Sequence, residues 1–139
     1  MKMLKNLKNK KGFTLIEIVI VIVIIAILAA MLVPSLLKWV DNANQKSFLE
    51  AANTIKTSTL SYVTEQYAAG TSIDDQGDIA DWQPISDLVG KKIAASKTDA
   101  SDYGVTFTVS AGNKLSSMVV TNGKYTATWD EAAQKWSVS

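Results

Sequence analysis

The chain has 139 residues, a length typical of one small domain, and 47% of them are apolar. It contains no cysteine, histidine or arginine, which excludes disulfides, thiol catalysis, histidine-based acid–base catalysis and zinc sites built from Cys or His. The net charge of +1 hides a lysine-rich N-terminus, and beyond residue 70 no basic patch suited to nucleic acid is visible.

The N-terminal third begins with lysines and then turns apolar. Five lysines precede Gly12, and the 21 residues 13–33 are apolar except for Thr14 and Glu17. At about 1.5 Å per residue, a helix of this length spans the roughly 30 Å hydrocarbon core of a bilayer. Because a lysine-rich end stays in the cytoplasm, we expect the rest of the chain outside.

Three interpretations of this segment compete. A secretory signal peptide would have a shorter apolar stretch and an A-x-A-like cleavage site after it. A plain membrane anchor explains the length and the lysines but not Glu17, since a charge in a membrane helix costs on the order of a few kcal/mol. In the third interpretation the chain is cut just before Phe13, and Glu17 pairs with the new terminal amine. Glu17 could also reach the lipid head groups, because it lies only a turn from the apolar boundary.

The stretch KKGFTLIEIVIVIVIIAILAAMLVP, residues 10–34, resembles the N-terminus of type IV pilins and their pseudopilin relatives. Their pattern is a short basic leader, Gly, Phe-Thr-Leu-x-Glu and an apolar stretch. The matching residues here are Gly12, Phe13, Thr14, Leu15 and Glu17. The resemblance is specific over residues 10–34, weaker along the next segment and close to silent beyond residue 70.

The resemblance implies a processing and assembly route. A prepilin peptidase would cut between Gly12 and Phe13, and the new amine of Phe13 would commonly be methylated. The subunit would wait in the inner or cytoplasmic membrane. A membrane platform and an assembly ATPase would then add it to an extracellular helical homopolymer, in which Glu17 faces the terminal amine of a neighbour. No cofactor is implied, and we expect the subunit itself to bind no nucleic acid.

Pro34 separates the apolar helix, residues 13–34, from an amphipathic continuation, residues 35–69. An interior proline removes one hydrogen bond and clashes one turn back, so the sequence predicts a kinked or loosened helix there. Gly70 is the expected helix stop, and one face of the continuation should cover the domain. That face consists of Leu37, Val40, Asn44, Phe48, Ala51, Ile55, Thr59, Tyr62 and Gln66, widened by Trp39, Ala43 and Ala52.

Residues 70–81 are predicted to form an acidic surface loop. Asp74, Asp75, Asp78 and Asp81 could converge on calcium, a hard cation that takes several oxygen ligands. Their spacing matches no known loop motif, and acidic loops are usually just solvated. No metal site is therefore assigned.

The remaining residues predict a short helix followed by a sheet. Residues 82–92 should form the helix, with Trp82 against the domain. Period-two patterns indicate four antiparallel strands, and Asn122-Gly123 is a hairpin turn. The strands lie at residues 104–110, 116–122, 124–130 and 135–139.

The apolar face of this sheet needs a cover. Phe48, Ile55 and Tyr62 are the expected contacts from the long helix. Trp129 and Trp136 should form a cross-strand pair that packs in the hairpin, in preference to a carbohydrate or receptor platform.

These features predict an α+β, type IV pilin-like fold. Residues 1–12 would be a removable leader, and residues 70–139 a globular head. The predicted function is a structural, non-enzymatic subunit of a type IV pilus, whose fibres serve adhesion, motility, biofilm formation or DNA uptake. The complete motif favours a major pilin.

Other functions are compatible with the same sequence. One alternative is a pseudopilin of a type II secretion or competence system. An alternative from another class is a membrane-anchored binding protein that never polymerises. An enzyme using Ser, Lys and Asp finds no support in any spacing. The missing cysteine pair favours a Gram-positive source for a pilin.

Overall fold

The computed structural model describes residues 12–98, 101–110 and 113–139, and the chain divides into two compact units, Met1–Asp41 and Asn42–Ser139. A single helix, α1 (Leu15–Ala68, 54 residues), contributes to both units. The helix ends at Ala68, and the predicted stop residue, Gly70, lies in the turn that follows with φ 87°. There the amides of Gly70 and Thr71 donate back to carbonyl oxygens of the last helical turn.

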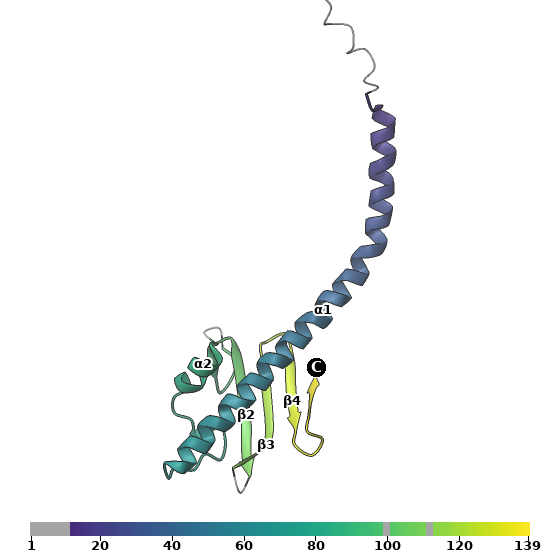
Figure 1. Ribbon diagram of the computed structural model, residues 1–139. Helices are drawn as coiled ribbons and strands as arrows, with labels where there is room; N and C mark the ends of the chain where they lie inside the picture. The colour runs from purple at the N-terminus through teal and green to yellow at the C-terminus, as the bar shows by residue number, and fades with distance from the viewer. Residues whose placement is uncertain (1–11, 99–100, 111–112) are drawn as a thin grey trace, which may run out of the picture. The chain divides into compact units, whose positions relative to one another are not determined.

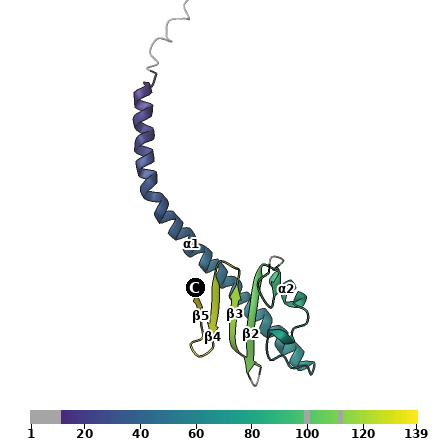
Figure 2. The same cartoon turned by 180° about the vertical axis from the view of Figure 1, so that it is seen from behind.

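The second unit is an α+β domain in which the C-terminal part of α1 crosses one face of a five-stranded sheet (Figures 1 and 2). The strands follow chain order across the sheet, and β2 to β5 are antiparallel. The elements after α1 are η1 (Gln76–Asp78), α2 (Gln83–Val89), β1 (Ile93–Ala94), β2 (Tyr103–Ser110), β3 (Lys114–Thr121), β4 (Thr126–Asp130) and β5 (Lys135–Val138).

The four predicted strands and the short helix are confirmed, but the predicted strand count is one too low. The extra strand, β1, pairs in parallel with β2, with Ile93 opposite Tyr103. Two residues are too few to show a period in sequence. The segment after β1 also passes close over β2, where a Cβ atom on Gly104 would clash with the backbone nitrogen of Lys97. Glycine at position 104 therefore permits this strand order.

The hairpin between β3 and β4 follows the predicted turn. Gly123 has φ 89°, and the Asn122 side chain accepts hydrogen bonds from the amides of Lys124 and Tyr125 at 3.0 and 2.8 Å. An asparagine that bonds to the backbone two and three residues ahead stabilises a tight turn. This turn sets the register that places Tyr125, Ala127 and Trp129 in the core.

The core lies between this sheet and α1. Buried α1 residues recur at three- and four-residue steps, as an amphipathic helix requires. Phe48 and Ile55 are buried and Tyr62 packs at the edge of the core, so the three predicted contacts are confirmed. The buried residues of α1 are Phe48, Ala52, Ile55, Thr59 and Val63.

The predicted face of the helix was wrong at its N-terminal end. Leu37, Trp39 and Val40 are 65%, 69% and 47% exposed instead of buried. The sheet is five strands wide, with strands of at most eight residues. It therefore covers only about four turns of helix, a limit that the period of the helix does not reveal.

A group of aromatic and polar side chains joins α1 to the last two strands. Trp129 and Trp136 stand opposite each other across β4 and β5, with ring centroids 5.5 Å apart, which confirms the predicted pair. The Lys56 ammonium lies 3.2 Å from the centroid of the Trp129 ring. The Trp136 Nε1 donates to Asn53 Oδ1 at 2.7 Å, and the Trp129 Nε1 donates to Glu131 Oε2 at 2.9 Å. Because these bonds occupy both indole N–H groups, the tryptophans here act as packing residues.

Lys56 is expected to make stability depend on pH. Burial lowers the pKa of its ammonium, and the Glu131 carboxylate opposes this by raising it. Between the lowered pKa and the ordinary lysine value of about 10.4, the unfolded chain keeps a proton that the folded chain has released. The free energy of unfolding should therefore rise with pH across this window, and Lys56→Met should lose that rise in chemical denaturation of the full chain in detergent.

Tyr103 complicates this measurement, because burial raises the pKa of its phenol. The folded state then holds its proton longer than the unfolded state, and the free energy of unfolding falls as pH rises through about 10. Both chains should accordingly be compared in a Tyr103→Phe background. Parallel pH profiles with and without Lys56 would contradict the prediction.

Candidate functional site

The N-terminal half of α1 is an apolar helix without a protein cover. Its most apolar stretch of 18 residues has a mean hydropathy of 3.3, and none of that stretch is buried. By length and composition this helix could cross a membrane. The exposed side chains from Ile16 to Val33 are almost all Ile, Val, Leu or Ala. Such a surface requires lipid or other protein around it.

Glu17, the charge inside this helix, forms a reciprocal cap with Thr14. The Thr14 amide and hydroxyl donate to Glu17 Oε2 at 2.9 and 3.1 Å, and the Glu17 amide donates to Thr14 Oγ1 at 3.3 Å. This is the capping-box arrangement, in which the residue before the helix and the third helical residue satisfy each other's amides. Thr14 thus acts as a helix-start residue.

The sequence analysis did not predict that Glu17 caps Thr14, although the sequence carries a pattern for it. Thr-x-x-Glu directly before an apolar run is the sequence form of a capping box. Both donors from Thr14 reach the same oxygen, Oε2, and no hydrogen bond among the described residues ends on Oε1. The cap therefore orients the carboxylate and leaves its second oxygen for another donor.

The expected cleavage point lies directly before the helix. Gly12 and Phe13 precede the first helical residue, Leu15, and have no regular secondary structure. Phe13 is 80% exposed. The bond between them therefore lies in an exposed segment outside the helix. Of the predicted leader, residues 1–12, residues 1–11 lie outside the described part of the chain.

Pro34 lies inside α1, with helical residues on both sides. It cannot donate to the Ala30 carbonyl one turn back. The helix continues past Pro34 to Ala68. The predicted kink stays a prediction.

The acidic loop uses its carboxylates on its own backbone. Asp75 Oδ1 accepts from the Gly77 amide, and Asp78 Oδ2 accepts from the amides of Asp74 and Asp75. Asp81 Oδ1 accepts from the Gln83 amide ahead of α2. Within the described ranges no three acidic side chains gather as a metal site would require. Asp75 and Asp78 therefore cap η1, and Asp81 binds the first amide of α2.

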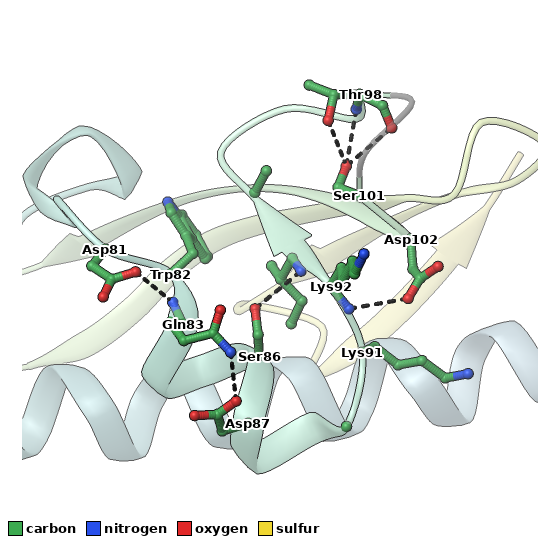
Figure 3. Close-up of a pocket in the computed structure, with 13 residues that line it drawn as sticks. Asp81, Trp82, Gln83, Ser86, Asp87, Lys91, Lys92, Thr98, Ser101 and Asp102 are labelled. Atoms are coloured by element: carbon green, nitrogen blue, oxygen red, sulfur yellow. Dashed lines mark hydrogen bonds between the residues drawn. The ribbon is translucent and has the colours of Figure 1, made fainter.

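An open cleft of about 700 Å³ lies beside α2 and β1 (Figure 3). Its polar groups hold these elements together. The Ser86 hydroxyl accepts from the Ile93 amide at 3.1 Å, and Asp102 Oδ2 accepts from the Lys92 amide at 3.0 Å. Gln83 donates to Asp87 across one helical turn. These contacts hold α2, β1 and the start of β2 together, so the polar groups named here have a structural role.

The geometry thus defines a class of protein: an apolar N-terminal helix with a capped charge at its start, continuing into an α+β head domain. Comparison with protein families finds a match to the "Prokaryotic N-terminal methylation motif" over residues 7–33. This motif is the hallmark of the type IV pilin and pseudopilin family, and the chain carries it at the predicted place. Curated proteins and solved structures give no match.

The cap predicts a local effect of Thr14. Thr14→Ala should loosen the first turn of α1 by about 0.5–2 kcal/mol, because the Glu17 amide loses its hydroxyl partner. Hydrogen exchange of the Glu17 amide in detergent micelles should become faster, and Thr14→Ser should restore the slow rate. Thr57→Ala is the matched control, because Thr57 bonds to a helix carbonyl far from this turn. Equal exchange in the Ala and Ser variants would contradict the cap.

Proposed function

We propose that this chain is a structural subunit of a type IV pilus that polymerises through its N-terminal helix. The observation that carries the proposal is an uncovered apolar helix with a single carboxylate at its start, inside the methylation motif. A lone carboxylate in an apolar surround is costly, and so is a lone ammonium. A filament that brings the two together lowers both costs. No catalytic step is needed for this role.

Processing would create the ammonium. A prepilin peptidase would cut between Gly12 and Phe13 and leave a free amine on Phe13, which is then methylated. The five leader lysines favour cleavage on the cytoplasmic side of the membrane, with the head domain outside. Their loss leaves nine lysines against thirteen acidic residues, a net charge of −4 for the mature chain.

Glu17 would then set the axial register of the filament. The capping bonds hold Oε2 toward Thr14, and Oε1 can accept from the amine of a neighbouring subunit. An otherwise uniform apolar helix resists sliding only weakly, so one charge pair selects a single position. The same capped geometry in every copy would present the carboxylate in one direction. A membrane platform and an ATPase would supply the assembly work.

Two other functions share part of this evidence. A pseudopilin of a secretion or competence system would use the same motif and the same head domain. A membrane-anchored binding protein would use the helix but would have no need of a second copy. The complete Phe-Thr-Leu-x-Glu sequence favours a subunit made for bulk assembly.

Intact-mass analysis of the native protein tests the processing step. We expect loss of residues 1–12 and one added methyl group on the amine of Phe13. A Cβ atom at position 12 would meet no neighbouring atom, so neither Gly12→Ala nor Gly12→Leu should disturb the fold. A difference in cleavage between these two variants would therefore report the size of side chain that the peptidase accepts. A native protein that keeps its lysine-rich end would contradict the proposal.

Two substitutions of Glu17 separate its capping role from its charge. Glu17→Gln removes the charge but keeps an acceptor for Thr14, while Glu17→Ala removes both the charge and the acceptor. We expect both variants to be processed. Both should form fewer filaments by a factor of at least about ten, since each 1.4 kcal/mol of lost affinity is a factor of about ten. Electron micrographs of sheared surface fractions give the count.

The Gln variant decides between these roles. Normal filaments from Glu17→Gln would show that the cap suffices and that no charge pair forms. Normal behaviour of both variants in the membrane, with no filaments from the unaltered chain, would favour the simple anchor.

A further inference from the structure

The apolar surface of the first unit does not stop at Pro34. Leu36, Leu37, Trp39 and Val40 are 57%, 65%, 69% and 47% exposed, and they lie beyond the part of α1 that the sheet covers. Lys38 is the one charged residue in this stretch, and from position 41 to position 47 the sequence becomes mostly polar. These four side chains, here called the Trp39 patch, are therefore a large apolar surface at the edge of the first unit.

The helix at the Trp39 patch has an apolar face and a charged face. At 100° per residue, Leu36, Trp39 and Val40 fall on one face of the helix, three and four positions apart. Lys38 falls on the opposite face. A tryptophan on an apolar face with a lysine behind it is the composition found where helices leave a bilayer. There the indole sits at head-group level, and the lysine extends its ammonium to the phosphates.

The position of the patch along α1 agrees with that composition. A hydrocarbon core of about 30 Å takes about 20 helical residues, which counted from Leu15 reach Pro34. Trp39 lies about 8 Å further along the helix, within the head-group layer. Measured back from Trp39, Glu17 lies about 33 Å away, close to the opposite boundary of the core.

We propose that the Trp39 patch anchors the unassembled subunit at the outer lipid interface. This proposal rests on the membrane-bound stage of the proposed function. With Trp39 held at one interface, Glu17 is kept near the other, where water and head groups lower the cost of its charge. The patch thereby sets the depth of the helix before another copy supplies an amine. Assembly would replace this lipid contact with protein.

Fluorine NMR of the full chain with nitroxide-labelled lipids, which broaden nearby resonances, tests the depth of Trp39. The protein is labelled with fluorotryptophan and reconstituted in vesicles of equal parts phosphatidylcholine and phosphatidylglycerol. Fluorine NMR then reports its four tryptophans, and Trp39→Phe identifies the resonance of Trp39. Lipids carry the nitroxide either on the head group or near the end of the acyl chain. Trp82, Trp129 and Trp136, which pack in the head domain, serve as internal controls.

We expect the Trp39 resonance to lose most of its intensity with the head-group nitroxide and little with the deep one. The three control resonances should keep theirs, and the result should be the same at two protein-to-lipid ratios. Intensity retained with both lipids would place Trp39 outside the membrane and overturn the proposal. A greater loss of intensity with the deep nitroxide would place Trp39 in the hydrocarbon core and would also overturn the proposal.

Two further outcomes identify what else could cover the patch. If the Trp39 resonance keeps its intensity only at the higher protein-to-lipid ratio, a second copy of the chain covers the patch. That result would overturn the lipid anchor but leave the proposed filament subunit intact. Failure of the protein to float with the vesicles would overturn both the anchor and the membrane-bound stage of the proposed function.

Discussion

A carboxylate in an apolar helix must find donors, because a charge without water or a partner is costly. In this chain Glu17 obtains its first donors from Thr14, within the same helix, through bonds that end on one oxygen. That local solution starts the helix and orients the charge. It does not neutralise the charge, so a positive partner from outside still lowers the free energy. The proposed filament follows from this remaining need.

The long helix serves two environments with one backbone. From Leu15 to Val40 its side chains are exposed and mainly apolar, whereas from Phe48 to Val63 one stripe is buried against the sheet. The change in side-chain pattern coincides with the division of the chain into two units. Between Leu15 and Val40 no described side chain is buried, so this part of the helix needs lipid or other protein around it. The second unit has a core of its own, formed between α1 and the sheet.

The head domain is held to the helix by side chains that the motif does not involve. Lys56 on the Trp129 ring and Asn53 on the Trp136 indole join α1 to β4 and β5. These contacts occupy the aromatic rings that a receptor platform would otherwise offer. The acidic loop likewise uses its aspartates to cap η1 and to bind the first amide of α2. Features of the head that suggested binding in the sequence are therefore mostly internal to the fold.

The sequence by itself determined the features that depend on neighbouring residues. The apolar span, the motif at Gly12 to Glu17, the stop at Gly70 and the alternation of β2 to β5 are local patterns, and each was predictable. Only the tertiary structure decided β1 and the end of the covered helix face. β1 requires the backbone at Lys97 to approach Gly104, and the exposure of Trp39 depends on how far a short sheet extends. Both depend on contacts between distant segments, for which a periodic pattern carries no signal.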